Sequence, residues 1–598
     1  MAFKTILHTL ALIMLLFVGA TAQEIAPVDK SKDEQQKAQA ELEKKALALL
    51  EETLDGAQLL KLPENRSYIF YTAADLLWKH DEKRARGFFQ DSLNALADAI
   101  KSVSASEFAR DPSGWMLMRQ RQEILTTVAR HDPQFALDLL RATRQVFTEN
   151  TPSYGRYMDQ ELELEQSIAA EVAAKDPKKA LQMAEESLAK GVSYETMSLL
   201  RQLQMKDGEA AKSFAGDLVK KLSTTDFTKN PQAAYVAQEL LHSQIQSNGN
   251  GLALGNQSAP KVKPLVLDEQ TKNELTDIII NAAMNSTPGQ PVFMMMQSLL
   301  PELEKRAPER VAQLRRKLAE NNDKLDPMFK MAMQYQSLMM DGKPEEILAA
   351  AAKAPPDMRG WLYQAAIRKL IQSGDLERAR QIISDNLTGA ERDNWLAQID
   401  KQLIARALKE NKLDEARKLL ERINPKEARL AQIAVMATDL FEKGDRKLAL
   451  ALLDETQELV NRAPESQGEI NAMMQVARAY AVIDPARAYG IIEPVLDQAN
   501  ALLAAAALLE KFGADRGLFK DGEYRLSVSM GYSYSLATQY RKEINALART
   551  DFARTRALAD RLQRDEARLM ARLLIAQAVL AERPESENGS GVGIGGSQ

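Results

Sequence analysis

The chain has 598 residues, no cysteine and a formal net charge of −5 at pH 7, and charged residues of both signs make up 27% of it. The lack of cysteine excludes disulfides and an acylated lipoprotein cysteine, and the lack of a clustered basic face argues against a nucleic-acid partner. The length exceeds what one hydrophobic core usually holds, and alanine, leucine, glutamate and arginine dominate, so we expect an extended all-α array.

The first 22 residues have the three parts of a secretory signal peptide. Lys4 supplies a positive start, residues 10–18 an apolar core, and residues 20–22 an Ala-Thr-Ala cleavage pattern. The apolar run is short for a membrane span, although an uncleaved anchor helix is the alternative. We predict a signal peptide at 1–22 and a polar leader at 23–30. We therefore expect an exported chain, periplasmic or extracellular, without a later transmembrane segment.

A first helical repeat region is predicted over residues 31–245. Ser31 and Glu34 form a capping-box pattern, from which a helix should run to about Leu54. Beyond it, an aspartate followed four residues later by an alanine recurs, which is typical of a capped helix start that packs closely on a neighbouring helix. These pairs are Asp81/Ala85, Asp132/Ala136, Asp176/Ala180 and Asp207/Ala211.

Turn-forming residues interrupt the helical pattern at 246–267. Glycine, asparagine, serine and proline replace the apolar periodicity there, so we predict a flexible linker or a long loop. A second helical repeat region should span 268–583 and close with an arginine-rich helix pair at 554–580. The Gly/Ser-rich tail at 584–598 should be disordered.

Methionine is concentrated early in the second region. Nine of the 23 methionines fall between residues 284 and 340, among them Met294, Met295 and Met296. Methionine lines adaptable binding grooves, so these three are candidate partner-binding residues. Methionine also fills irregular helix cores, which is the alternative interpretation.

A phrase repeated three times marks the junction between paired helices. Gly374, Asn411 and Gly444 each follow an apolar stretch of helical period and precede another. Glycine and asparagine adopt the left-handed conformation that ends a helix, and Asp375 and Asp445 follow at once, as N-caps do. Since one helix pair cannot cover its own apolar face, neighbouring pairs must stack.

The alanines of the phrase lie at the spacing of a helix–turn–helix repeat. Ala379, Ala416 and Ala449 are 37 and then 33 residues apart. The phrase resembles the inter-helix junction of tetratricopeptide repeats, most clearly over 361–500. Of the three first helices only one carries the small residue that this family has seven positions before the glycine, at Ala437, so the resemblance is to a degenerate form. It implies a right-handed superhelix of antiparallel helix hairpins that holds a protein partner.

Glycines alternate with aromatic residues from 512 to 540, which predicts a loop or shortened helices. Tyr524, Tyr532 and Tyr534 are candidate partner-binding residues, because tyrosine offers a stacking surface. The alternative is that these rings pack in the core with the hydroxyl group at its rim.

No motif in the sequence assembles a reaction centre. We find neither the ligand spacing of a metal site nor a nucleotide-binding motif in a fitting context, so we predict no metal, no cofactor and no catalytic residue. Glu465-Ser466, with Met473-Met474-Gln475 downstream, resembles a phrase of lytic transglycosylases, in which the glutamate is the general acid. The glycine of that phrase is absent, and Pro464-Glu465 also fits a helix start.

The sequence predicts a non-catalytic helical-repeat scaffold that mediates protein–protein interaction in the bacterial cell envelope. The alternatives are an envelope enzyme acting on glycan and a purely structural envelope protein. Converging carboxylates beside aromatic side chains in a pocket would favour the enzyme, and a continuous groove would favour the scaffold.

Overall fold

The computed structural model describes most of the chain between residues 32 and 581. The residues described are 32–103, 113–150, 160–248, 265, 267–286, 299–300, 303–322, 335, 338–339, 342–457, 463–512, 519–526 and 543–581. The chain divides into two compact units. The first joins Met1–Ala99 to Leu338–Gln598, and the second is Ile100–Ser337.

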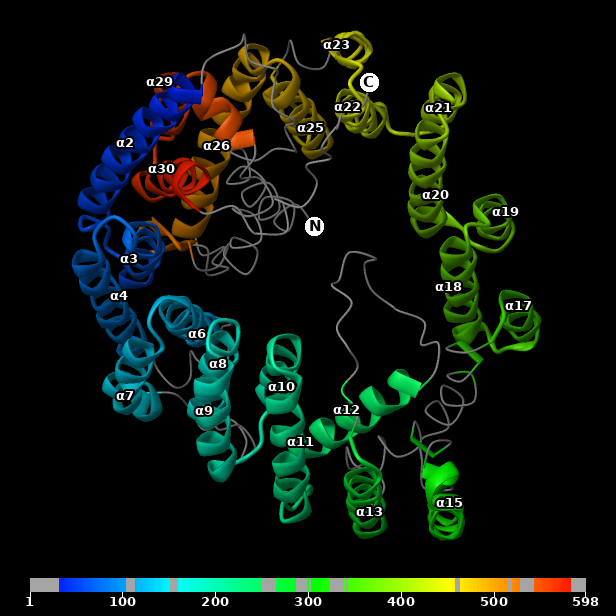
Figure 1. The fold of residues 1–598 in the computed structure, drawn as a ribbon. Helices are drawn as coiled ribbons and strands as arrows, with labels where there is room; N and C mark the ends of the chain where they lie inside the picture. Colours follow the sequence, from blue (N-terminus) through cyan, green and yellow to red (C-terminus); the bar gives the residue numbers. More distant parts are fainter. Residues whose placement is uncertain are drawn as a thin grey trace, which may run out of the picture. The chain divides into compact units, whose positions relative to one another are not determined.

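The described fold is an all-α solenoid of antiparallel helix hairpins, and the first unit adds one short β-hairpin (Figure 1). The first unit contains α2 (Lys32–Ala57), α3 (Pro63–Leu77), α4 (Glu82–Lys101), α17 (Pro344–Lys353), α18 (Pro356–Ser373), α19 (Leu376–Asn386), α20 (Gly389–Lys409), α21 (Leu413–Leu420), α22 (Lys426–Glu442), α23 (Arg446–Asp454), α25 (Gln467–Ile483), α26 (Pro485–Lys511), β1 (Phe519–Lys520), β2 (Glu523–Tyr524), α29 (Phe552–Asp560) and α30 (Asp565–Leu580). The second unit contains α6 (Ser113–His131), α7 (Pro133–Asn150), α8 (Gln160–Ala173), α9 (Pro177–Lys190), α10 (Glu195–Lys206), α11 (Gly208–Ser223), α12 (Pro231–Asn248), α13 (Glu269–Asn285) and α15 (Pro308–Asn322).

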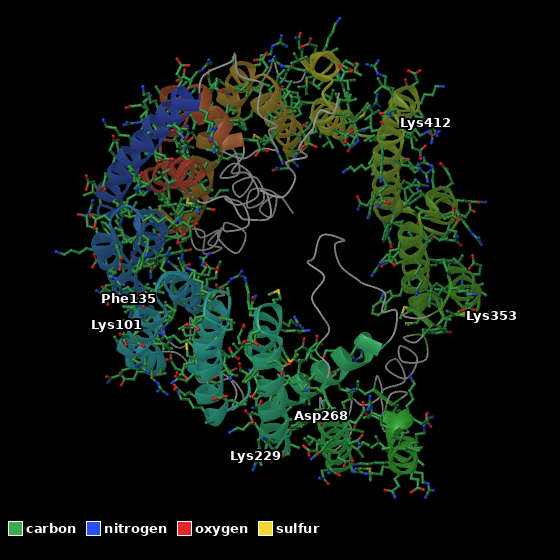
Figure 2. All side chains as sticks on the ribbon, in the orientation of Figure 1. Lys101, Phe135, Lys229, Asp268, Lys353 and Lys412 are labelled. Atoms are coloured by element: carbon green, nitrogen blue, oxygen red, sulfur yellow. The ribbon has the colours of Figure 1, made fainter. Side chains whose placement is uncertain are left out.

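The three repeated phrases form the predicted junctions in the first unit. The backbone φ angles are +82° at Gly374, +57° at Asn411 and +92° at Gly444, so all three residues lie in the left-handed region. Asp375 and Asp445 each accept a hydrogen bond from the backbone N–H three residues on, as predicted. The middle junction has a lysine, Lys412 (labelled in Figure 2), at the N-cap of α21. No side-chain cap forms there.

The aspartate–alanine pairs predicted in the first repeat region share the aspartate N-cap of two of the phrases and the buried alanine of all three, but the residues directly before these aspartates have no positive φ angle. Each of the four aspartates accepts a hydrogen bond from a backbone N–H in the first turn of the following helix. The alanines of these junctions and of the three phrases are fully buried, and they are Ala85, Ala136, Ala180, Ala211, Ala379, Ala416 and Ala449. Because a methyl group is the largest side chain that such a contact admits, these positions set how closely the helices stack.

A β-hairpin lies where we expected a loop or shortened helices. Strands β1 and β2 pair antiparallel, with Phe519 opposite Tyr524. Asp521 and Gly522 between them have φ angles of +52° and +77°. Two consecutive positive φ angles define the type I′ turn, which suits the twist of a two-residue hairpin and favours Asp-Gly. The flanking residues 513–518 and 527–542 lie outside the described part.

We expected no segment after the signal peptide to be long and apolar enough to cross a membrane, but helix α26 is. In the described part of the chain it alone meets that test, by length and composition only, and 44% of the tested window is buried. Core helices pass the same test. Here Tyr489, Val495 and Leu496 are buried in the first unit, where α26 packs against α25 and α29, so packing accounts for much of the apolar composition.

The remaining segment predictions stay predictions. The signal peptide at 1–22, the leader at 23–30 and the tail at 584–598 lie outside the described residues. The predicted linker at 246–267 falls within the second unit, and most of it is also outside the described part, while α12 continues to Asn248.

Because Gly444 has a positive φ angle, adding a methyl group to it should lower the stability of this junction. Gly444→Ala should destabilise the α22–α23 pair by about 1–2 kcal/mol, because alanine resists a positive φ although no atom lies near the added Cβ. Hydrogen exchange of residues 440–454 should accelerate accordingly. Gly490→Ala is the matched control: this glycine sits inside α26 with open space around it, so the change should stabilise by about 0.5–1 kcal/mol. Equal effects of the two substitutions would contradict the left-handed junction.

Candidate functional site

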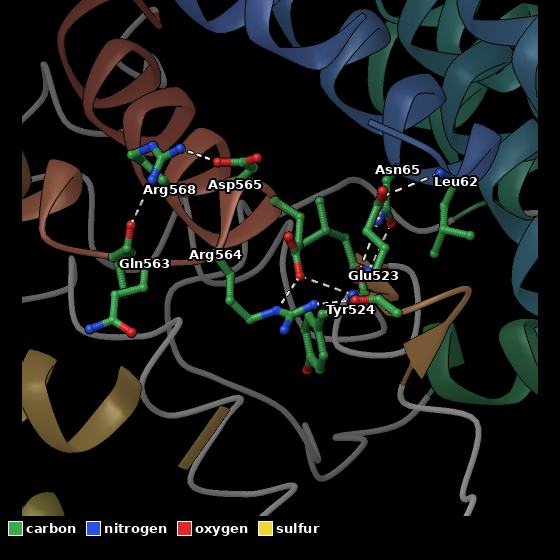
Figure 3. A network of polar contacts seen from close by, with 12 residues as sticks. Leu62, Asn65, Glu523, Tyr524, Gln563, Arg564, Asp565 and Arg568 are labelled. Carbon is green, nitrogen blue, oxygen red and sulfur yellow. Dashed lines mark hydrogen bonds and ion pairs between the residues drawn. The ribbon is translucent and has the colours of Figure 1, made fainter. Parts of the chain in front are cut away.

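A buried polar network of the first unit surrounds the hairpin β1–β2 (Figure 3). Residues more than 450 positions apart in sequence meet there, since the hairpin contacts α3 near one end of the chain and α30 near the other. We call this network the hairpin clamp. Its members are Glu64, Asn65, Glu523, Tyr524, Arg525, Arg564 and Glu566.

The carboxylate of Glu523 lies at the start of α3. Its Oε2 accepts a hydrogen bond from the Lys61 backbone N–H at 2.6 Å, and its Oε1 accepts one from the Leu62 backbone N–H at 3.3 Å. Helix N-termini leave N–H groups without intrahelical partners and carry partial positive charge, so a carboxylate is favoured in this position. Glu523 therefore supplies from the hairpin a cap that α3 lacks locally, because its N-cap residue Leu62 has no side-chain acceptor.

Asn65 connects the first turn of α3 to three polar groups of the hairpin. Its Nδ2 donates to Glu523 Oε1 at 2.7 Å and to the Tyr524 carbonyl at 2.8 Å, and its Oδ1 accepts from the Leu526 N–H at 2.9 Å. The side chain is fully buried. An amide is the one side-chain group that can donate twice and accept at the same place, so its chemistry matches this position.

The start of α30 holds the other side of the hairpin. Glu566 Oε1 accepts from the Tyr524 N–H at 2.9 Å and from Arg564 Nε at 2.5 Å. Arg564 also donates to the Gly522 carbonyl at 2.5 Å, and its guanidinium lies 4.8 Å from the centre of the Phe519 ring. Arg564 thus contacts β1 at Phe519, and Glu566 binds β2 at Tyr524.

Two further contacts join the same parts of the first unit. The buried side chains of Arg525 and Glu64 form an ion pair at 3.5 Å. On the surface, the two terminal nitrogens of the Arg556 guanidinium, Nη1 and Nη2, donate to the two carboxylate oxygens of Glu52, at 3.1 and 2.6 Å. Helix α2 accordingly packs against α30, and the Arg556–Glu52 pair joins α29 to α2.

The hydrogen bonds of the clamp support a structural role for Glu523. Burial raises the pKa of Glu523, while the hydrogen bonds from Asn65, Lys61 and Leu62 lower it and the charge of Glu566 raises it again, so the net direction is upward. Both oxygens of Glu523 are engaged by donors from α3 and the residues before it. A general acid needs a proton within reach of a substrate, and Glu523 and Glu566 are only 6% and 4% exposed. Among the described residues, no group of three or more histidines and carboxylates could hold a metal ion.

Of the six predicted partner-binding residues, the structure describes one. Tyr524 is 1% exposed, and its ring packs edge to face against Phe519 with the centroids 5.4 Å apart. This burial matches the core alternative and corrects the partner-binding assignment, because a side chain with 1% exposure presents no surface to a partner. The other five, Met294, Met295, Met296, Tyr532 and Tyr534, lie outside the described residues.

Glu465, the candidate acid of the glycan-acting alternative, lies at a helix start. Its backbone N–H donates to Glu469 Oε2 at 2.7 Å, and Ser466 accepts from the Glu469 N–H as the N-cap of α25. The Glu465 side chain is exposed. This geometry matches the capping interpretation of Pro464-Glu465.

Sequence reasoning missed Asn65, Glu523 and Glu566. One signal could have indicated the hairpin: Asp521-Gly522 is a strong short-range hairpin pattern when apolar residues alternate on both sides, as Phe519 and Tyr524 begin to do here. Nothing local marks Asn65 as its partner, since the two segments are separated by 458 residues.

Comparison with known proteins adds little to this geometry. No family model matches the chain, and no curated protein matches it. Among solved structures, the chain is similar to the crystal structure of Ton1535 from Thermococcus onnurineus NA1, at 13% identity over 70% of this chain and 98% of that one, with a TM-score of 0.15. It is also similar to a circular tandem repeat protein with novel repeat topology and enhanced subunit contact surfaces, at 11% identity over 90% and 99%, again with a TM-score of 0.15. At such TM-scores neither likeness carries an argument here.

The hairpin clamp predicts that a near-isosteric substitution of Asn65 strongly destabilises the first unit. Asn65→Asp replaces the amide that donates to Glu523 and Tyr524 with an acceptor, and it places a second carboxylate beside a buried one. The first unit should lose about 3 kcal/mol of stability in urea unfolding, and the amide hydrogens of Tyr524 and Leu526 should exchange faster.

Asn94→Asp makes the same chemical change at an exposed site. Asn94 Oδ1 accepts from Gln90 Nε2 on the surface of α4, and an aspartate keeps that acceptor. Its effect should stay within about 0.5 kcal/mol. If Asn65→Asp were equally mild, the hairpin clamp would not hold the first unit together.

Proposed function

We propose that this chain is an exported, non-catalytic scaffold of tetratricopeptide-like repeats that binds a protein partner in the bacterial cell envelope. Its fold supplies stacked helix hairpins, which in repeat proteins present extended binding surfaces. The N-terminal residues support export, and the junctions at Gly374, Asn411 and Gly444 support the tetratricopeptide-like assignment.

One observation carries the proposal: the described chain leaves large aromatic side chains exposed on several helices. Glu523 and Glu566 are taken up by structural hydrogen bonds. Trp361 is 60% exposed on α18, and Tyr194 and Tyr235 are nearly half exposed in the second unit. Aromatic side chains are enriched where proteins bind other proteins.

The test uses residues 23–598 carrying an affinity tag, incubated with envelope extract. A captured protein is identified by mass spectrometry and purified, and its binding is measured by calorimetry. We expect a saturable complex that Trp361→Ala or Tyr194→Ala/Tyr235→Ala weakens by at least about tenfold, the loss of one central aromatic anchor. Gly490→Ala, which changes an exposed helical position without removing an aromatic ring, is the control.

The same protein is incubated with purified peptidoglycan, and soluble fragments are sought by chromatography. A scaffold releases none. Release of fragments that Glu465→Gln abolishes would overturn the proposal in favour of an enzyme, and the absence of any stable complex would favour a purely structural role.

A further inference from the structure

The C-terminal end of α26 is apolar on every side but covered on only one. Residues 501–509 are all alanine or leucine. Leu503 and Ala506 are each 1% exposed, whereas Leu508 is 56% exposed. Phe512, the C-cap residue of the helix, is 82% exposed. At 3.6 residues per turn the exposed residues share the side opposite Leu503 and Ala506. We call them the α26 patch, and they are Ala501, Ala504, Ala505, Leu508, Leu509 and Phe512.

Helix α26 extends beyond α25 and α29, the two described helices with which it has most contact. It has 27 residues, and α25, which is joined to it at Asp484, has only 17, so its last ten residues run past the start of α25. The link that follows α29 is bonded to Asn500, through the Arg561 carbonyl and the Gln563 N–H. The patch begins at the next residue. Because a helix that is apolar all round is normally buried all round, this end lacks a cover on its exposed side.

The patch is complementary to a second copy of itself. When two copies of α26 lie antiparallel about a two-fold axis midway between residues 506 and 507, Ala501 of each copy lies level with Phe512 of the other. Ala505 then lies level with Leu508, and Ala504 with Leu509. Each large side chain of the patch therefore falls at the height of an alanine, which leaves room for it to pack. In a two-fold interface each of these contacts occurs twice.

A lipid surface suits the patch less well. A helix that lies on a membrane carries lysine or arginine beside its apolar face, where these side chains meet anionic headgroups. Before the patch, both carboxylate oxygens of Asp497 accept hydrogen bonds from Arg561 at 2.8 Å. At the other end, Glu510 precedes Lys511. Both ends thus carry balanced charge, which adds no attraction to an anionic membrane.

The exposed area predicts a weak dimer. Phe512 at 82% exposure contributes roughly 150–200 Å², and with the leucines and alanines the patch offers roughly 300–400 Å² per copy. A stable interface buries about 800 Å² per partner. We therefore expect a reversible dimer with a dissociation constant in the micromolar range.

We propose that the α26 patch is a homodimer contact, in which two copies of this chain pack their α26 ends antiparallel about a two-fold axis. The contact is separate from the partner-binding role proposed above, because Trp361, Tyr194 and Tyr235 lie outside α26.

The test measures sedimentation velocity of residues 23–598 over a concentration series that spans the micromolar range. The parent chain should shift from monomer to dimer. Ala501→Glu and Phe512→Lys should each weaken the dimer at least about tenfold, because each places a charge against an apolar side chain of the second copy. Both positions are exposed, so the fold should persist, and the circular dichroism melting curve checks this.

An equal mixture of the Ala501→Glu and Phe512→Lys chains tests the antiparallel register. In the mixed dimer the introduced carboxylate of one chain lies level with the introduced ammonium group of the other, while the second contact keeps the original alanine and phenylalanine. Association of the mixture should return to within about fivefold of the parent, although each variant alone stays monomeric.

A matched pair of leucine substitutions provides the control. Leu508→Glu should abolish the dimer, whereas Leu59→Glu makes the same change at a leucine that is 85% exposed in the turn after α2 and should leave the dimer unchanged. Equal losses in the two variants, a parent chain that stays monomeric at every concentration, or a mixture that fails to associate would overturn the proposal. Flotation with phosphatidylethanolamine–phosphatidylglycerol vesicles that only Leu508→Glu abolishes would overturn it in favour of a lipid surface.

Discussion

The carboxylate of Glu523 at the start of α3 is the contact on which the first unit most depends. The short hairpin that carries it brings polar backbone groups into a buried place, and each must find a hydrogen-bond partner or destabilise the fold. The partners come from two distant parts of the chain, Asn65 on one side and Glu566 on the other. Satisfying the hairpin therefore requires that both parts be present together, and this couples residues 32–99 to the helices near residue 580.

The stacking of helices away from the clamp follows from a simpler rule. At the three repeated phrases a residue at positive φ ends one helix, and at these and the four aspartate–alanine junctions a fully buried alanine lies near the start of the next helix. Because this rule is local, it could be predicted: the positions of Gly374, Asn411 and Gly444 and the buried alanines follow from residue type and spacing alone. The all-α solenoid followed in turn from the need to cover each apolar stripe.

The clamp and the tyrosine pair could not be predicted in the same way. Asn65 has no special neighbours in sequence, and its role appears only when a segment 458 residues away folds beside it. Tyr194 directly precedes α10 and Tyr235 lies within α12, and only the packing of α10 against α12 brings their ring centroids to 5.1 Å. Tyr524 shows the opposite case, since its aromatic character suggested a binding surface while burial makes it part of the core. Long-range pairing decides all of these, and periodicity carries no information about it.

Met1–Ala99 and Leu338–Gln598 associate in one compact unit. This association can be measured directly, because the chain has no cysteine and two introduced cysteines would be its only labelling sites. Glu52→Cys/Arg556→Cys places two labels at an ion pair whose partners are 504 residues apart in sequence. Double electron–electron resonance on the spin-labelled chain should give one narrow distribution of short distances between the two labels. A short bis-maleimide should crosslink the two cysteines within a single chain. The pair Glu52→Cys/Lys418→Cys, with its second label on α21, is the control for random encounter. A broad distribution at long distances for Glu52→Cys/Arg556→Cys would contradict the account.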